Sequence, residues 1–504
     1  MLQHAPVIHL LAPFYAAIII CIAGMWRKET AYPIAVTALS LSLLSAVATL
    51  IKVGIAGPVI YAMGGWSAPF GIHFHIDALS ALMAVLIQVV ALLTAIHSRH
   101  PIHSSIGEKS YLYYPLFLLF VTGVTGICQT ADAFNLYVLI EVSALTSYAL
   151  IAMGEKRSVH ASFNYLLVGS LGATLYLLGV GYLYLKTGTL NMQDLNFIMT
   201  TRELFSTPTI QVALILLMVG LWIKMAQFPF HGWLPNAYTW APSPSAALMG
   251  PLMTKVMVYV MIRFMISVYG LDAIVDSMWT TWVPYLAIAG IVYGSLMALS
   301  QHYLRRMVTY IIVAEIGYMV GAAWLATELS ITAAFYHVIS DALMTLALFL
   351  CIAAMRVRHD IRSIHDMENI FKKMPITMVA FSIVALSLVG IPPTSGFISK
   401  WYLISAGIDA GHWPYIIALL LASFANAVIF FRIFEIGVFG KKPAEGHHHE
   451  ESHDKKYLSE APFSMLIPCL VISASIILLG IFNQPFIEMI STTISSISGG
   501  EVLQ

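Results

Sequence analysis

The strongest constraint on this chain is a succession of long apolar segments. A transmembrane helix needs about 20 mostly apolar residues. Hydrophobic types make up 59% of the sequence and charged types only 10%, whereas a soluble globular chain carries roughly 25% charged residues. We therefore predict an all-α polytopic membrane protein of about fourteen transmembrane helices. These helices are expected at 6–25, 32–53, 78–97, 111–128, 133–153, 160–185, 209–228, 244–269, 280–300, 307–325, 330–354, 375–404, 413–438 and 462–481.

The same composition excludes several functional classes. A soluble enzyme of 504 residues would precipitate with so few charges. Equal numbers of basic and acidic residues, 25 of each, leave no basic field for a nucleic acid. The four cysteines are widely separated, and no polar segment exceeds a few tens of residues. We therefore expect no metal cluster, flavin, haem or nucleotide cofactor in this chain.

Basic residues are distributed unevenly over the loops between the apolar segments. Seventeen of the 25 follow odd-numbered segments, three lie on the opposite side, and five fall within the predicted helices. Loops rich in lysine and arginine stay in the cytoplasm. The asymmetry therefore supports the number of segments, and it predicts a multi-pass protein of the cell (inner) membrane with both termini outside.

Two loops differ from the others. The 54–77 segment is rich in glycine and proline with alternating aromatic residues, which favours a short hairpin on the outer surface. The 440–461 segment is strongly polar and contains His447, His448, His449 and His453. Histidines at these spacings can converge on a metal ion, but we interpret the segment as a solvated cytoplasmic loop and assign no metal site.

Several ionisable residues lie inside the apolar segments, where each costs about 2.5–3.5 kcal/mol to insert. Such residues often mark ion pathways. Arg263 and Arg432 lie near helix ends and can extend to the surface, so we give them a structural interpretation. The remaining ones are candidate proton-pathway residues: Glu141, Lys224, Lys255, Glu315, His337, Asp341 and Lys400.

Glu141 and Lys224 are expected to form a pair. Glu141 has no charged neighbour within eight residues on either side. To remain charged inside the membrane, it needs a cation from another helix. Lys224 in the seventh segment is the natural candidate. The alternative is a static ion pair that only joins two helices.

Prolines interrupt the seventh and twelfth segments beside two of the buried lysines. Pro229 removes a helical hydrogen bond just after Lys224, and Pro392 and Pro393 remove two before Lys400. Backbone groups freed in a membrane are tolerated only inside protein or beside a cavity, so broken helices with buried polar groups are typical of transporters. An ordinary proline kink is the alternative, but it leaves the lysine unexplained.

The two breaks lie five helices apart, and an odd step inverts the orientation of a helix. This spacing predicts two inverted five-helix repeats with broken helices 7 and 12. We accordingly divide the chain into four parts: an N-terminal three-helix segment with the outer loop (1–110), a first repeat (111–270), a second repeat (271–440), and the His-rich loop with the last helix (441–504).

His337 and Asp341 are spaced i and i+4 in the eleventh segment, so they share a helix face. Histidine titrates near neutral pH and can relay a proton. A satisfied polar pair at a helix interface is the alternative. In order along the membrane, the buried charged residues are consistent with a line of exchangeable proton sites.

The sequence resembles the antiporter-like membrane subunits. This family includes the D-type subunits of multisubunit Na⁺/H⁺ (Mrp) antiporters, the proton-pumping subunits of respiratory complex I, and their counterparts in membrane-bound hydrogenases. The resemblance covers most of residues 77–405 and implies fourteen helices with two inverted five-helix repeats. It is carried by the stretches DAFNLYVLIEVSALTSYAL, LGATLYLLGVGYLYLKTGTLNMQDL, KMAQFPFHGWLPNAYTWAPSPSAALM, LRRMVTYIIVAEIGYM and GIPPTSGFISKWYL.

The resemblance also implies roles by position. Glu141 looks like the family's fifth-helix glutamate and Lys224 like its seventh-helix lysine. Lys255 matches the eighth-helix connecting lysine. Lys400 matches the twelfth-helix exit residue, which is lysine in Mrp D-like members and glutamate in one type of complex I subunit.

Two residues depart from the family pattern. Thr345 stands where many relatives carry a lysine, and Glu315 stands where histidine or glutamine is common. Because threonine cannot carry a proton, we expect the central relay to run through Glu315, His337 and Asp341 with water. His337 and Asp341 should then face the tenth and twelfth helices, and loss of the Thr345 hydroxyl should be nearly silent.

Three functional hypotheses follow. The first, favoured by the resemblance, is an ion-translocating subunit of an Mrp-type Na⁺/H⁺ antiporter, D-like. The second is the same module inside a redox complex such as a hydrogenase, formate hydrogenlyase or NADH:quinone oxidoreductase. The third is a passive membrane scaffold, against which the buried lysines argue. The expected partners are other membrane subunits of a hetero-oligomeric complex, protons with Na⁺ as the candidate second ion, and the lipid bilayer.

Overall fold

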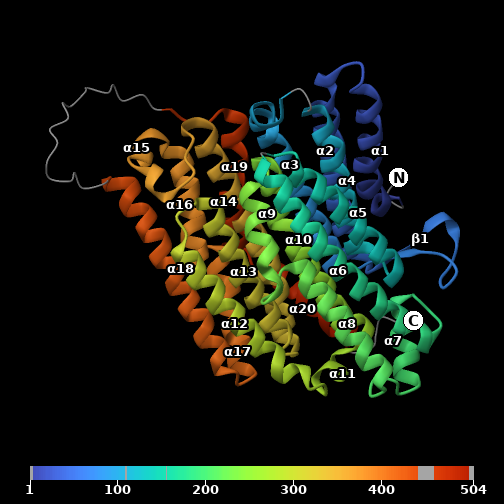
Figure 1. Ribbon diagram of the computed structural model, residues 1–504. Coiled ribbons are helices and arrows are strands. Elements are labelled where there is room, and N and C mark those ends of the chain that lie inside the picture. Colours follow the sequence, from blue (N-terminus) through green and yellow to red (C-terminus); the bar gives the residue numbers. More distant parts are fainter. Residues whose placement is uncertain (1–3, 108–109, 155, 441–458, 499–504) are drawn as a thin grey trace, which may run out of the picture.

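The computed structural model describes residues 4–107, 110–154, 156–440 and 459–498, and these form an almost entirely helical assembly (Figure 1). Most of the helices lie roughly side by side, as expected for a polytopic membrane protein. The long helices are α1 (Ala5–Ala23), α2 (Ala31–Ala56), α3 (Ala78–Ile106), α4 (Ser110–Gln129), α5 (Ala133–Ala152), α6 (Lys156–Thr187), α8 (Pro208–Met225), α10 (Ser243–Arg263), α12 (Trp279–Ser300), α13 (Leu304–Ala323), α14 (Glu328–His359), α16 (Pro375–Val389), α17 (Ser395–Asp409), α18 (Trp413–Phe439), α19 (Phe463–Ile481) and α20 (Gln484–Ser498).

Thirteen segments among the described residues are long and apolar enough to cross a membrane. They coincide with thirteen of the fourteen predicted segments. The remaining one, 375–404, is divided into α16 and α17, which have 15 residues each. A helix of that length rises only about 22 Å, less than the roughly 30 Å hydrocarbon core. The twelfth segment therefore reaches across as two half-helices.

Both predicted helix breaks are present. Helix α8 ends at Met225, and Ala226 is left-handed with φ 62°. A 3₁₀ turn at Phe230–Trp233 and the short helix α9 (Leu234–Trp240) then complete the seventh segment. In the twelfth segment α16 ends at Val389 and is followed by Gly390, whose φ of 93° only glycine adopts without strain. The division into repeats at 111–270 and 271–440 remains a proposal.

Helix α14 lies at the centre of the assembly (Figure 1). Its most apolar stretch is completely buried, and it packs against α10, α13, α16, α17 and α19. A helix that is surrounded by protein on all sides can carry polar side chains only if neighbouring helices supply their partners. The polar residues of α14 are therefore set among four or more other helices.

The loops form small elements at the two ends of the assembly. Figure 1 shows α7 (Met192–Thr201) and α11 (Leu271–Val275) at the lower end, while α15 (Ile370–Lys373) lies at the upper end. The hairpin expected in 54–77 is confirmed, because β1 (Val59–Ala62) and β2 (His73–Ile76) pair antiparallel. A π-helical turn, Phe264–Tyr269, extends α10.

Helix α20 was not predicted as a separate element. It buries Ile487, Ile490 and Ile494 and packs mainly on α14. The hydroxyl of Ser495 also donates to Glu328 Oε2 at 2.6 Å, beside the first turn of α14. Its isoleucines recur at helical spacing among polar residues, so α20 covers one end of the central helix with its apolar face.

Candidate functional site

Glu141 on α5 and Lys224 on α8 form the ion pair expected from the sequence. Lys224 Nζ donates to Glu141 Oε1 at 3.1 Å. The lysine side chain is 1% exposed, whereas the glutamate is 26% exposed. Lys224 lies in the last turn of α8, just before the break at Ala226. The pair therefore links a buried lysine on α8 to a partly exposed glutamate on α5.

Lys255 on α10 and Asp341 on α14 form a second, fully buried ion pair. The distance from Lys255 Nζ to Asp341 Oδ2 is 2.9 Å. Thr345 lies one turn after Asp341, and its hydroxyl donates to Asp341 Oδ1 at 3.0 Å. The same hydroxyl accepts from Lys255 Nζ at 3.3 Å. Thr345 thus bridges the two charged groups.

The position of Asp341 corrects one sequence expectation. Asp341 was expected to face α13 and the broken twelfth segment together with His337, but its carboxylate pairs with Lys255 of α10 instead. Residues four apart on a helix differ by about 40° in direction and about 6 Å in height. The two side chains therefore meet different neighbouring helices although they share one broad face.

His337 faces α13 and α17, as expected. Its Nε2 lies 2.8 Å from Glu315 Oε2 on α13, and its Nδ1 lies 3.0 Å from Ser399 Oγ on α17. Ser399 Oγ donates its only proton to the Gly396 carbonyl, so it accepts from Nδ1. One proton must then lie between Nε2 and Glu315, either as imidazolium with carboxylate or as imidazole with carboxylic acid.

Lys400 on α17 is held by neutral groups. Its Nζ donates to the Leu388 carbonyl at 2.5 Å and to Ser423 Oγ at 3.0 Å. The Leu388 carbonyl lies in the last turn of α16 and lacks a helical donor, since Pro392, four residues later, has no N–H. It also accepts from Asn426 Nδ2 at 3.2 Å. The proline break thus creates the acceptor for the lysine, and no carboxylate pairs directly with Lys400 among the described residues.

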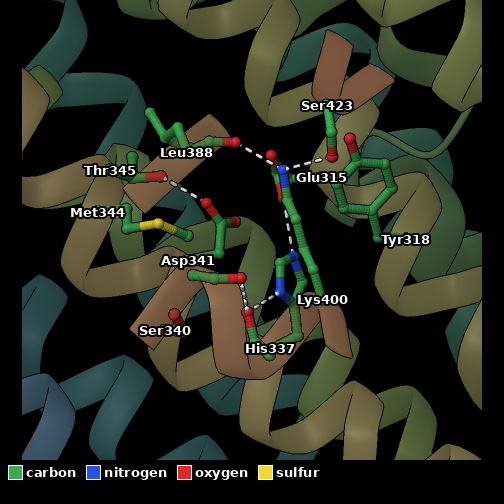
Figure 2. Close-up of polar contacts among 12 residues, drawn as sticks. Glu315, Tyr318, His337, Ser340, Asp341, Met344, Thr345, Leu388, Lys400 and Ser423 are labelled. Carbon is green, nitrogen blue, oxygen red and sulfur yellow. Dashed lines mark hydrogen bonds and ion pairs between the residues drawn. The ribbon is translucent and has the colours of Figure 1, made fainter. Parts of the chain in front are cut away.

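Figure 2 shows these groups in one layer of the interior. Lys400 lies beside the Glu315–His337 pair, with Asp341 and Thr345 to the other side. Four of these five residues have ionisable side chains, and all five are buried.

Several buried polar atoms close in sequence to the candidate residues have no hydrogen-bond partner among the described residues. These atoms include Glu315 Oε1, the Tyr318 hydroxyl, the Thr254 hydroxyl, the Trp222 indole N–H and the Gln227 amide. Buried polar groups are nearly always hydrogen-bonded to protein or to ordered water. Such atoms are the places at which water is expected to enter.

Sequence reasoning missed four contacts in the site. Thr345 is spaced i+4 from Asp341, so a contact was predictable from the helix repeat. The Leu388 carbonyl was predictable from Pro392 four residues later. Ser399 precedes Lys400 directly, but serine is too common in apolar helices to carry a signal. Ser423 lies on α18, and no feature of the sequence places it near Lys400.

Arg263 is not a free surface cation. Its Nη1 lies 2.5 Å from Asp77 Oδ2, and its side chain is 14% exposed. Asp77 also caps α3, because Oδ1 accepts from the backbone N–H of Ser80. Arg263 therefore does not extend to the surface as expected, and its structural role stays a prediction. The histidines 447–453 lie outside the described residues.

The fold and the buried charges define a helical membrane protein of the antiporter-like class. Residues 130–425 match the family described as "NADH:quinone oxidoreductase/Mrp antiporter, TM". The chain belongs to this family, as the resemblance implied. It is an antiporter-like, ion-translocating membrane subunit.

Two curated relatives lie on different branches of this family. The chain is 36% identical to NADH-quinone oxidoreductase subunit N of Desulforudis audaxviator over 495 residues, covering 97% of this chain and 98% of the relative. It is 31% identical to the D-type subunit of the Na(+)/H(+) antiporter of Alkalihalophilus pseudofirmus over 435 residues, covering 86% and 85%.

Chains of two solved membrane complexes have the same fold as this chain. A chain of the Mrp complex from Dietzia sp. superposes with a TM-score of 0.87 at 25% identity, covering 99% of this chain and 98% of that one. A chain of the membrane-bound sulfane sulfur reductase, an archaeal respiratory membrane complex, gives 0.86 at 28% identity, covering 98% of each. Both are subunits of multisubunit membrane complexes.

Proposed function

We propose that this chain conducts protons through the series Glu141, Lys224, Lys255, Asp341, His337, Glu315 and Lys400. The observation that carries the proposal is the set of buried charged groups, each held by partners from a different helix. Charged groups inside a membrane are costly, and a purely structural protein gains little from so many of them.

The Glu141–Lys224 pair is the proposed switch at the start of the series. An ammonium that is 1% exposed is stabilised mainly by its carboxylate. If Glu141 takes up a proton or turns toward the open face of α5, Lys224 is left as an uncompensated buried charge, which costs about 3–5 kcal/mol. Release of the lysine proton relieves this cost, so opening of the pair drives a proton inward.

The central groups pass the proton on. Lys255 and Asp341 balance each other, so a proton gained by Asp341 leaves Lys255 uncompensated in the same way. His337 and Glu315 already share one proton across 2.8 Å. Water at the unpartnered buried atoms would bridge the remaining gaps.

Lys400 is the proposed exit. It contacts a carbonyl and a hydroxyl, and it has no counter-ion in direct contact among the described residues. In this respect it differs from Lys224 and Lys255, each of which contacts a carboxylate. A proton that reaches Lys400 is accordingly the one most readily released to the medium or to a neighbouring subunit.

For the complex itself, we propose an Mrp-type Na⁺/H⁺ antiporter in which this chain is D-like. The lysine at position 400 and the superposition on an Mrp-complex chain support this assignment. A redox-driven complex is the second candidate, because identity is higher to an oxidoreductase subunit N. We also propose the orientation in which the basic loops face the cytoplasm and both termini lie outside.

Purification of the native complex separates the two candidates. Under the first proposal, mass spectrometry finds only membrane subunits of antiporter type, and vesicles exchange Na⁺ for protons without a redox substrate. Hydrogenase or dehydrogenase subunits in the same particle, with proton movement that requires electron transfer, would support the second. A particle without any ion movement in either assay would leave only the scaffold role.

A further inference from the structure

A strongly basic pocket lies away from the proton series, where several loops meet. Its volume is about 1190 Å³. Among the described residues, its lining includes six basic residues and one acidic residue, Asp360, which pairs with Arg362 at 2.9 Å. We call this site the basic pocket, and its basic residues are Lys156, Arg157, Arg305, Arg356, Arg358 and Arg362.

Three long helices begin at the wall of the basic pocket. Helix α6 starts at Lys156, α10 at Ser243 and α13 at Leu304, and each has at least 20 residues. The N-terminal end of a helix carries partial positive charge and unpaired backbone N–H groups. These ends add to the field of the basic side chains, so the pocket as a whole favours an anion.

The walls of the pocket are held in place by specific contacts. Arg305 Nη1 donates to the Ala241 carbonyl at 2.9 Å, which ties α13 to the start of α10. The Leu304 N–H donates to the Arg362 carbonyl at 3.0 Å, which ties α13 to the loop after α14. The Arg157 guanidinium stacks on Trp240 at 4.8 Å from the ring centroid. The basic groups are therefore positioned by the fold.

The wall also contains two buried polar atoms that have no hydrogen-bond partner within the described part of the chain, Thr239 Oγ1 and His359 Nε2. The Thr239 hydroxyl can donate to an oxygen ligand. Guanidinium groups match the geometry of phosphate oxygens, because they donate two parallel hydrogen bonds. Among anions, the set of donors is best suited to a phosphate group.

We propose that the basic pocket binds the phosphate group of an acidic phospholipid. The pocket is much larger than a free phosphate ion requires. It lies at the ends of membrane-spanning helices, where phospholipid head groups are found. Tyr303 and Val357 in its lining are 55% and 39% exposed and offer apolar surface beside the charges. An aromatic residue at this level is typical of the membrane–water interface.

The experiment measures lipid binding to the purified native complex by native mass spectrometry in a neutral detergent. The probes are dioctanoyl phosphatidylglycerol, dioctanoyl phosphatidylcholine and glycerol 3-phosphate. We expect saturable binding of the first, none of the second, and at least roughly tenfold weaker binding of the third, because it lacks the acyl chains.

Three variants locate the binding. The double variant Lys156→Gln with Arg157→Gln, and separately Arg358→Gln, should each weaken phosphatidylglycerol binding by roughly tenfold. The matched control is Lys186→Gln with Arg202→Gln, which removes two exposed charges outside the pocket. The control should bind as the wild type does. None of these residues belongs to the proposed proton series. The result of this test therefore does not depend on whether that series is correct.

Several outcomes would overturn the proposal. Equal binding of phosphatidylcholine would show that charge does not select the ligand. Glycerol 3-phosphate binding as tightly as the lipid would assign the pocket to a free phosphate. Equal losses in the pocket variants and the control would place the lipid elsewhere. A carboxylate-directed cross-link from Lys156 to a partner subunit, without phosphate binding, would assign the pocket to an acidic segment of that partner.

Discussion

Lys255 Nζ lies 2.9 Å from Asp341 Oδ2, and the pair joins α10 to α14 at the centre of the molecule. Helix α10 belongs to the proposed first repeat and α14 to the second. The two side chains are 0% and 1% exposed, so each depends on the other for compensation of its charge. A change in the protonation of either side chain therefore directly alters the charge compensation of the other.

The Glu141–Lys224 pair should behave as one functional unit. We expect Glu141→Ala and Lys224→Ala each to abolish proton movement by the reconstituted complex, since either change removes the proposed switch. The double variant should be no worse than either single one, because the unit is lost already. Size-exclusion chromatography checks assembly, and Glu488→Gln on the exposed face of α20 is the control. Near-normal transport by Glu141→Ala would rule this unit out.

In the central layer, His337 is expected to carry a proton, whereas Thr345 is expected to position its neighbours. His337→Ala should cut transport severely, because it removes the proton shared with Glu315. From the sequence alone Thr345→Ala was expected to be nearly silent, but its hydroxyl contacts both Asp341 and Lys255. We now expect a partial loss, which Thr345→Ser restores. Transport rates of the three variants decide this, and a silent Thr345→Ala would make its two hydrogen bonds functionally irrelevant.

Lys400 should tolerate a carboxylate better than an apolar side chain. Lys400→Glu should retain part of the transport activity, since a carboxylate can also carry a proton at this place. Lys400→Leu should retain none, because the Leu388 carbonyl and Ser423 then face a group that cannot be protonated. Equal transport by Lys400→Leu and the wild type would show that the break in the twelfth helix has only a structural role.

Asp77 should make stability depend on pH. Burial tends to raise its pKa, but the Arg263 and His75 charges and the hydrogen bond from Ser80 outweigh burial and lower the pKa below the usual 3.8. A lowered pKa means that the stabilisation is present above the usual pKa and is lost as pH falls through the folded-state pKa. Asp77→Asn should thus destabilise by about 3 kcal/mol near neutral pH.

Thermal unfolding in detergent from pH 3 to pH 7 measures this effect. The difference between the wild type and Asp77→Asn should shrink toward the acid end, because protonation then neutralises the wild-type carboxyl as well. Asparagine can still accept the Ser80 N–H that caps α3. A difference that stays constant over the whole range would therefore show that the charge of Asp77 is not the source of its stabilisation.

The sequence predicted the helices and their breaks because apolar length and proline are local signals. It also predicted the Glu141–Lys224 contact, because a lone buried carboxylate has few cations to choose from. It placed Asp341 beside the wrong helix, because the direction of a side chain depends on how α10 and α14 pack. Ser423 could not be found, since its contact with Lys400 depends entirely on tertiary structure.

The most direct test of the central claim is proton uptake by proteoliposomes containing the native complex with Asp341→Asn. This change keeps the size of the side chain but removes the charge that compensates Lys255. We predict loss of nearly all proton movement, and further exchange of Lys255→Met in the same chain should recover thermal stability but not transport. Proton uptake by Asp341→Asn at the wild-type rate, with equal amounts of complex reconstituted, would contradict conduction through the buried charges.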